Sequence, residues 1–72
     1  MLMGSEKYIV CKGRQYLVGI PYEDLAYIRY SPSPYDAWKS REFDKAMRIA
    51  KRVGGKVMRF NQLTGRTTGG WK

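Results

Sequence analysis

Short runs of hydrophobic residues, separated by glycine, proline or charged residues, fill the first thirty positions of the chain. Residues 8–12 and 15–20 are rich in Tyr, Ile and Val, which favour strands, and a Gly-Arg pair lies between them. This pattern predicts a β-hairpin. In its second arm Tyr16, Val18 and Ile20 share one face, which we expect to be the buried face. Residues 25–30 predict a third strand, which follows a polar turn at residues 22–24.

From residue 43 onward the hydrophobic positions follow the period of an α-helix. One side of this predicted helix is apolar and the opposite side is basic. We expect the side chain of Asp44 to cap the start of the helix. Gly54 is expected to end it, because glycine readily adopts the left-handed conformation found after helices. The residues expected on the apolar side are Ala46, Met47, Ile49, Ala50 and Val53.

The remaining segments complete the expected order of elements, β-β-β-α-β. Two prolines make residues 31–36 a loop, residues 56–60 predict a strand, and residues 61–65 predict a turn. Beyond Arg66 the abundance of Thr and Gly favours an untethered tail over a returning strand, and the position of Trp71 is left open. We therefore expect one α+β domain over residues 1–72, with flexible ends at 1–6 and 67–72. In it, a small antiparallel or mixed sheet of three to four strands packs against one amphipathic helix.

Composition and charge narrow the function. The chain is 43% hydrophobic and 14% aromatic, which is typical of a folded domain and not of a disordered one. Fourteen Lys and Arg against six Asp and Glu give a net charge of +8. Such a field attracts anionic partners, first nucleic acid, but also anionic lipid or acidic protein surfaces. A surplus of one sign can also serve solubility alone.

Catalytic and metal-binding chemistry is scarce in this sequence. It has no histidine and a single cysteine, Cys11, so a zinc site and most acid–base mechanisms lack their usual residues. Residues 64–70 are glycine-rich but lack the Lys-Ser/Thr pair of a P-loop, and Gly54-Gly55 follows the helix instead of preceding it. We therefore expect no enzyme activity, no metal and no cofactor. We expect Cys11 to be a buried small hydrophobic residue.

The cysteine count and the start of the chain also bear on location. One cysteine cannot form an intramolecular disulfide, which favours a reducing compartment. Residues 1–5 show neither the charged segment nor the apolar stretch of a signal peptide or membrane span. A cytoplasmic location without membrane attachment is expected.

The basic side of the predicted helix is the first candidate site, and its expected partner is nucleic acid. Four or five cations within about eleven residues can contact several phosphates, which makes affinity fall with added salt. A basic stripe that continues to Arg59 or Arg66 would favour this partner. The alternative is a solvated face, because any surface helix exposes polar residues. The candidate residues are Arg41, Lys45, Arg48, Lys51 and Arg52.

A second candidate surface combines three aromatic residues, Tyr30, Tyr35 and Trp38, with the neighbouring Lys39 and Arg41. Aromatic rings among cations stack on unpaired bases, and the same residue types are enriched in protein interfaces. The alternative function is therefore a protein-interaction module that engages an acidic protein. A third interpretation places Trp38 in the core.

Open strand edges would also permit a homodimer, and the sequence leaves the oligomeric state open.

The segment from Phe43 to Gly65 resembles small uncharacterised proteins encoded by bacteriophages and prophages. The resemblance covers about residues 27–66. It implies a compact α+β fold without enzyme activity, located in the host cytoplasm, in a protein that binds or inhibits host or phage macromolecules. The residues that carry it are Phe43, Ala46, Ile49, Ala50, Gly54, Gly55, Val57, Phe60, Asn61, Thr64 and Gly65.

Overall fold

The computed structural model of the chain describes residues 4–19 and 28–71. In this part of the chain, five strands form one antiparallel sheet with the order β3-β2-β1-β4-β5. The α+β class is thus confirmed, whereas the predicted three to four strands were too few. In chain order, the elements are β1 (Glu6–Lys12), β2 (Gln15–Gly19), β3 (Arg29–Ser31), the 3-10 helix η3 (Pro34–Asp36), α1 (Phe43–Val53), β4 (Lys56–Asn61) and β5 (Arg66–Trp71).

The strand missed by sequence analysis is β5, which pairs antiparallel with β4. The untethered tail was therefore a wrong prediction for residues 67–71, and at the other predicted flexible end Glu6 already belongs to β1. The turn before β5 is held by Asn61, whose Oδ1 accepts hydrogen bonds from the N–H groups of Leu63 and Thr64. Backbone pairing thus makes a strand of a sequence with few strand-forming side chains.

The predicted hairpin is present as β1 and β2, but the buried face of β2 was assigned wrongly. Leu17 is fully buried, whereas Tyr16 and Val18 are half-buried. The reason is that both faces of the sheet are covered: Leu17 packs beneath α1, and Tyr16 packs on the other face. Ile20, the polar turn at 22–24 and residues 25–27 of the predicted third strand lie outside the described residues.

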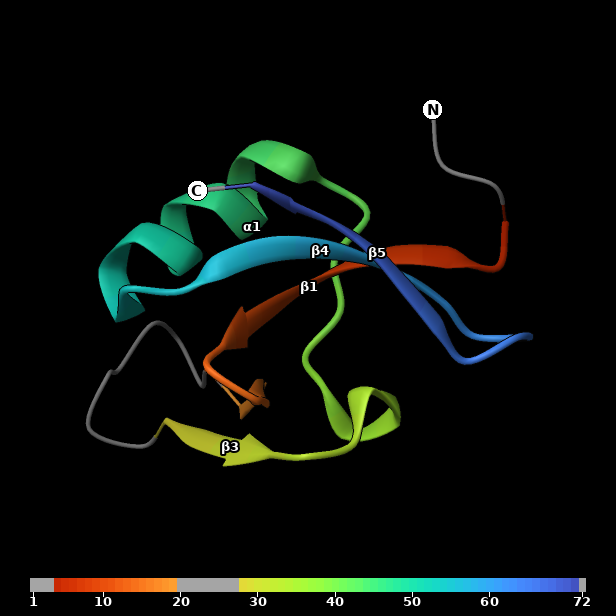
Figure 1. Cartoon of the computed structure of the whole chain (residues 1–72). Helices are drawn as coiled ribbons and strands as arrows, with labels where there is room; N and C mark the ends of the chain where they lie inside the picture. The colour runs from red at the N-terminus through yellow and green to blue at the C-terminus, as the bar shows by residue number, and fades with distance from the viewer. Residues whose placement is uncertain (1–3, 20–27, 72) are drawn as a thin grey trace.

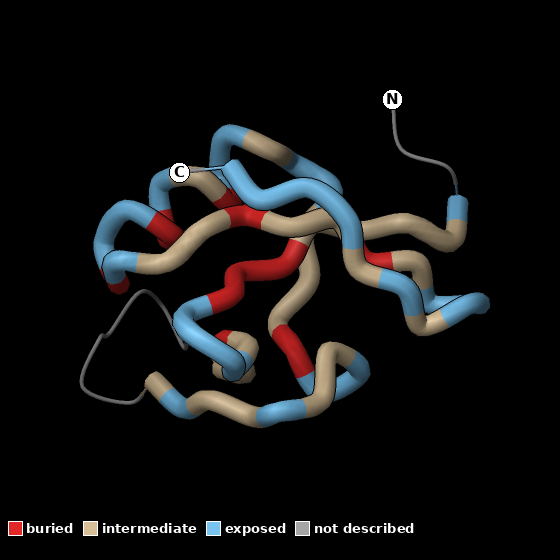
Figure 2. Tube along the Cα trace, in the orientation of Figure 1, coloured by how far each residue is buried: buried red, intermediate tan, exposed pale blue. Residues whose placement is uncertain are grey.

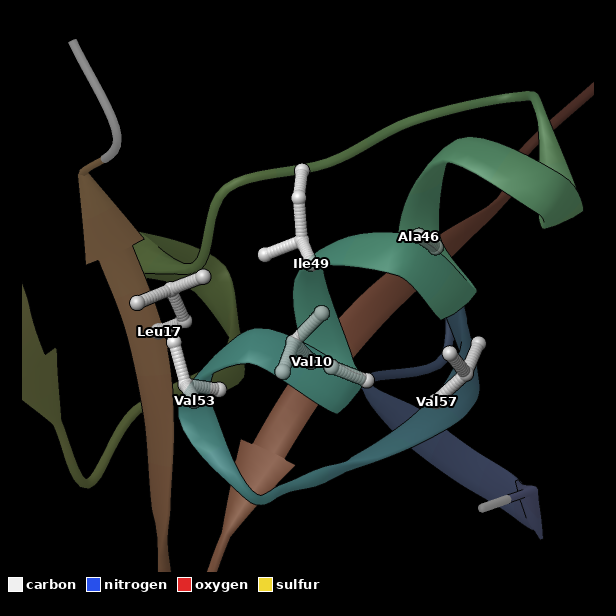
Figure 3. Packing of buried hydrophobic residues seen from close by; sticks show 7 residues of the cluster. Val10, Leu17, Ala46, Ile49, Val53 and Val57 are labelled. Carbon is white, nitrogen blue, oxygen red and sulfur yellow. The ribbon is translucent and has the colours of Figure 1, made fainter. Parts of the chain in front are cut away.

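The apolar side of α1 forms the larger part of the core, as predicted. Ala46, Ile49, Ala50 and Val53 are buried and Met47 is partly buried. They pack against side chains from β1, β2 and β4 (Figure 3), among them Val10, Leu17 and Val57. On the opposite face of the sheet, the buried residues are Ile9, Ala37 and Phe60.

The two ends of α1 differ in how well they were predicted. Gly54 ends the helix with a φ of 74°, as expected for a left-handed cap. At the start, the capping position is occupied by Glu42 and not by Asp44, and its side chain makes no capping hydrogen bond. Asp44 lies two positions past the capping residue, within the first turn, where its negative charge interacts favourably with the positive end of the helix dipole.

A short segment connects the two sides of the sheet. Trp38 N–H donates to the Leu17 carbonyl at 2.8 Å, and Tyr8 and Ser40 exchange two backbone hydrogen bonds of 2.7 and 2.9 Å. Residues 38–40 thus bridge β2 and β1, which pair with each other only at two positions near their turn. The segment leads from η3 on one side of the sheet to α1 on the other (Figure 1).

Candidate nucleic-acid interface

The basic side of α1 is exposed, but its two halves differ in charge. Lys45, Arg48, Lys51 and Arg52 all face solvent. Arg41 is also exposed and precedes the helix, so it does not belong to the helical face. In the first half, Glu42 and Asp44 line a shallow hollow of about 390 Å³ together with Phe43, Lys45 and Arg48. The carboxylates reduce the positive potential of this half.

The second half of α1 ends beside two other cationic segments. The turn between β1 and β2 carries Lys12 and Arg14, and β4 begins with Lys56, which is the register partner of Cys11. A hollow of about 300 Å³ lies between these segments, lined by Cys11, Lys12, Gly13, Gly54, Gly55 and Lys56. We call this surface the basic end; its cations are Lys12, Arg14, Lys51, Arg52 and Lys56.

No acidic residue belongs to the segments that form the basic end. Residues 11–16 and 48–58 contain neither Asp nor Glu. The last turn of α1 also exposes backbone carbonyls at the negative end of the helix dipole, which Lys51 and Arg52 complement. These segments therefore carry positive charge without a carboxylate in their own sequence to offset it.

Gly55 allows the end of α1 and strand β1 to approach each other closely. A Cβ at this position would lie 2.6 Å from the backbone oxygen of Cys11 and 3.3 Å from Val10 Cγ1. Its N–H donates to the Ala50 carbonyl at 2.8 Å, so the backbone is held against the helix end as well. Gly55 is therefore required for close contact between the end of α1 and β1, beyond the capping role of Gly54.

Cys11 lies at the base of this hollow as a structural residue. It is buried, as predicted, and its thiol donates to the Gly13 carbonyl with an Sγ–O distance of 3.4 Å. This contact helps to hold the turn that carries Lys12 and Arg14.

Sequence analysis identified Lys51 and Arg52 but missed Lys12, Arg14 and Lys56. Lys12 and Arg14 lie far from the helix in sequence and come near it through the pairing of β1 with β4, whereas Lys56 follows the helix directly, at the start of the predicted strand. The Gly-Gly pair after the helix was the available signal, because it marks a close backbone approach.

Arg59 and Arg66 do not extend the basic end. Arg59 is opposite Tyr8 in the sheet, and the Tyr8 ring contacts Phe43 at the start of α1. The Arg59 guanidinium lies near Glu6, with an Nε–Oε2 distance of 3.6 Å. Arg66 pairs with Asn61 at the same end of the sheet. The two arginines therefore belong to a separate surface.

The three aromatic residues of the second candidate surface do not form one patch. Tyr30 and Trp38 are half-buried against the cluster beneath α1. Tyr35 is 56% exposed and meets the buried Phe60 edge-to-face, with ring centroids 5.1 Å apart, on the opposite face of the sheet. A partner that contacts all three residues would have to span both sides of the domain.

Lys39, which accompanies these aromatic residues, holds the loop around η3. Its Nζ donates to the carbonyls of Tyr35 and Ala37 at 2.8 and 2.9 Å and lies 5.8 Å from the Phe60 ring centroid. Burial lowers the pKa of Lys39, while Asp36 acts to raise it and Lys7 to lower it. Its ammonium group therefore serves the packing of this loop.

Comparison with known proteins found no matching family model, no matching curated protein and no matching solved structure. Among residues 4–19 and 28–71, no helix is long and apolar enough to span a membrane. Within the same residues, no three His, Cys, Asp or Glu side chains are grouped in a way that could hold a metal ion.

Proposed function

We propose that this protein binds nucleic acid without catalysing a reaction, and that the basic end is its phosphate-binding surface. The observation that supports this proposal most is that three segments, which carry five cations and no acidic residue, come together around one hollow. Each phosphate that such cations neutralise releases condensed counterions, which is the main source of affinity for nucleic acid. The net charge of +8 would also steer an anionic polymer toward the domain.

Two double variants with the same change in charge test this proposal. Lys12→Ala/Lys51→Ala removes two cations from the basic end. Lys45→Ala/Arg48→Ala removes two cations from the first half of α1, where Glu42 and Asp44 also lie. All four residues are exposed, so both variants should fold. Binding to a fluorescent 20-base-pair DNA duplex would be measured by anisotropy at low salt.

We expect the first variant to bind markedly more weakly than the second, because it removes phosphate contacts and not only net charge. Equal weakening of both variants would mean that net charge alone attracts the duplex and would overturn the assignment of the basic end. Failure of the unmodified protein to bind either this duplex or a single strand of the same length would overturn nucleic-acid binding itself.

A further inference from the structure

A second surface lies on the face of the sheet that carries α1, beyond the part that the helix covers. The register places Tyr8, Arg59 and Thr68 side by side across β1, β4 and β5. The next row on the same face consists of Glu6, Asn61 and Arg66. Figure 2 shows that β5 is exposed along most of its length. A hollow of about 440 Å³ lies here, lined by Glu6, Asn61, Thr64, Arg66 and Thr68.

An aromatic ring lies farther along β5 than Thr68, the last residue of this strand that lines the hollow. The Trp71 ring contacts the rings of Phe43 and Tyr8 edge-to-face, with centroid distances of 5.5 and 6.4 Å. Tyr8 and Phe43 also contact each other at 5.2 Å, so the three rings hold one another in place. Trp71 is nevertheless 38% exposed, on a strand whose Thr68 lines the hollow.

Asn61 and Arg66 line the hollow with hydrogen-bond donors, and Arg59 lies beside it in the neighbouring row. Within residues 4–19 and 28–71, Arg59 Nε is buried and has no hydrogen-bond acceptor; the carboxylate of Glu6 is 3.6 Å away. Asn61 uses its Oδ1 to accept from two backbone N–H groups, so its amide nitrogen is the group that it offers to a ligand. Arg66 is exposed at the rim.

We infer that this hollow, which we call the sheet-face hollow, binds one unpaired nucleotide of a single-stranded nucleic acid. The inference rests on the proposed function and names its substrate class. The base stacks on Trp71, and the phosphate is held by Arg66, since a guanidinium group binds phosphate through paired N–H donors. Glu6 and Asn61 supply an acceptor and a donor for the edge of the base. The volume lies within the range of ligand sites, about 300–1,000 Å³.

The geometry favours an unpaired nucleotide over a duplex. In a duplex each base already stacks on its neighbours, so its flat face cannot reach a tryptophan ring. The basic end would contact the backbone of the same strand farther along.

The experiment uses Trp71 fluorescence as the direct readout. A Trp38→Phe variant leaves Trp71 as the single tryptophan of the chain, because the sequence contains two. The probes are a twelve-nucleotide oligothymidine and a DNA duplex with the same number of phosphates. We expect the single strand to quench Trp71 in a saturable manner and to bind more tightly than the duplex, by roughly fivefold or more, as expected for stacking of one base.

Two substitutions test the contacts. Trp71→Leu should weaken binding of oligothymidine by roughly fivefold or more and leave binding of the duplex unchanged. Since this variant loses ring contacts with Phe43, Arg66→Ala is a second test that does not disturb the core. It should weaken binding of the single strand more than Arg41→Ala, a matched loss of one exposed arginine outside the hollow.

The outcomes separate this inference from the proposed function. If Trp71→Leu and Arg66→Ala bind oligothymidine as the unmodified protein does, while Lys12→Ala/Lys51→Ala weakens both probes, the sheet-face hollow is not a nucleotide site and the proposed function stands. The same conclusion follows if an oligoglutamate peptide of equal charge quenches Trp71 as strongly, because the hollow would then recognise charge alone.

Discussion

The ring of Trp71 occupies the space that a side chain at Gly69 would need. A Cβ built on Gly69 would lie 2.5 Å from both Cζ3 and Cη2 of the indole. The register between β4 and β5 shifts at this point, from Arg59 opposite Thr68 to Val57 opposite Trp71, so β5 carries an extra residue. This bulge, with φ angles of 89° at Gly69 and 145° at Gly70, allows the ring to lie over its own strand and reach Phe43.

Gly69→Ala should therefore destabilise the domain and displace the Trp71 ring. The added methyl group meets the ring, and alanine tolerates the positive φ poorly, so we expect a loss of about 1–3 kcal/mol in the free energy of unfolding. Urea denaturation would measure the loss. In a Trp38→Phe background, the emission of Trp71 should also shift to longer wavelength as the ring becomes more exposed.

Gly13→Ala is the matched control. Gly13 has a similar φ of 64°, but a Cβ there would meet nothing within 4 Å. This variant should lose only the cost of the left-handed backbone, about 1 kcal/mol, without a change in Trp71 emission. If the two variants were equally destabilised and shared the emission of the parent protein, the ring would not lie over Gly69.

The sequence was sufficient to predict α1, because its apolar and basic residues separate cleanly at helical spacing and Gly54 marks its end. It was not sufficient for β5. Thr67, Thr68, Gly69 and Gly70 include no large hydrophobic residue, and their strand arises from backbone pairing with β4. The sequence also left the position of Trp71 open, because the ring is placed by a β-bulge that no local sequence pattern predicts.

The buried face of β2 shows a second limit. Alternation marks the core side of a strand when only one side is covered. Here α1 covers Leu17, while η3 and its neighbours cover the side of Tyr16, so both faces carry apolar residues. The basic end shows a third limit, because Lys12 and Lys56 come together through long-range pairing of β1 with β4.

Gly55→Ala tests how the basic end is held together. Its new Cβ would lie 2.6 Å from a backbone oxygen of Cys11, which cannot move away as a flexible side chain could. We expect a loss of about 2 kcal/mol or more in the free energy of unfolding, measured by urea denaturation. Gly54→Ala is the control: its φ is also positive, at 74°, but its Cβ would meet nothing within 4 Å. A loss for Gly55→Ala no greater than that for Gly54→Ala would contradict the close approach of β1.

Lys39 should give the domain a measurable dependence on alkaline pH. Burial lowers the pKa of Lys39 below its ordinary value of 10.5, against the opposing effect of Asp36 and together with that of Lys7. Between the lowered pKa and 10.5, the unfolded chain binds more protons at this side chain than the folded chain does, so its contribution to stability rises with pH. Below the lowered pKa, the partly buried charge of Lys39 costs the folded state the same amount of stability at every pH.

The comparison with Lys39→Gln isolates this contribution, because the other titrating groups are common to both proteins. Urea midpoints would be measured from neutral pH to just above the ordinary lysine pKa. The difference in stability between the parent protein and the variant should move in favour of the parent as the pH rises. A difference that is constant, or that moves in favour of the variant, would contradict the lowered pKa.

The salt dependence of DNA binding should show how many phosphates the basic end contacts. For duplex DNA, the logarithm of the binding constant falls with the logarithm of salt concentration, with a slope of about −0.9 for each phosphate neutralised. Lys12→Ala/Lys51→Ala should therefore reduce the magnitude of this slope by about 1.8 if both lysines contact phosphate. Lys45→Ala/Arg48→Ala should change it less, because Glu42 and Asp44 line the same hollow as those two cations. Anisotropy titrations at several salt concentrations would measure both slopes. Equal slopes for the two variants would contradict this prediction. They would mean that phosphates contact the cations of both halves of the helix, because each cation that contacts a phosphate contributes equally to counterion release.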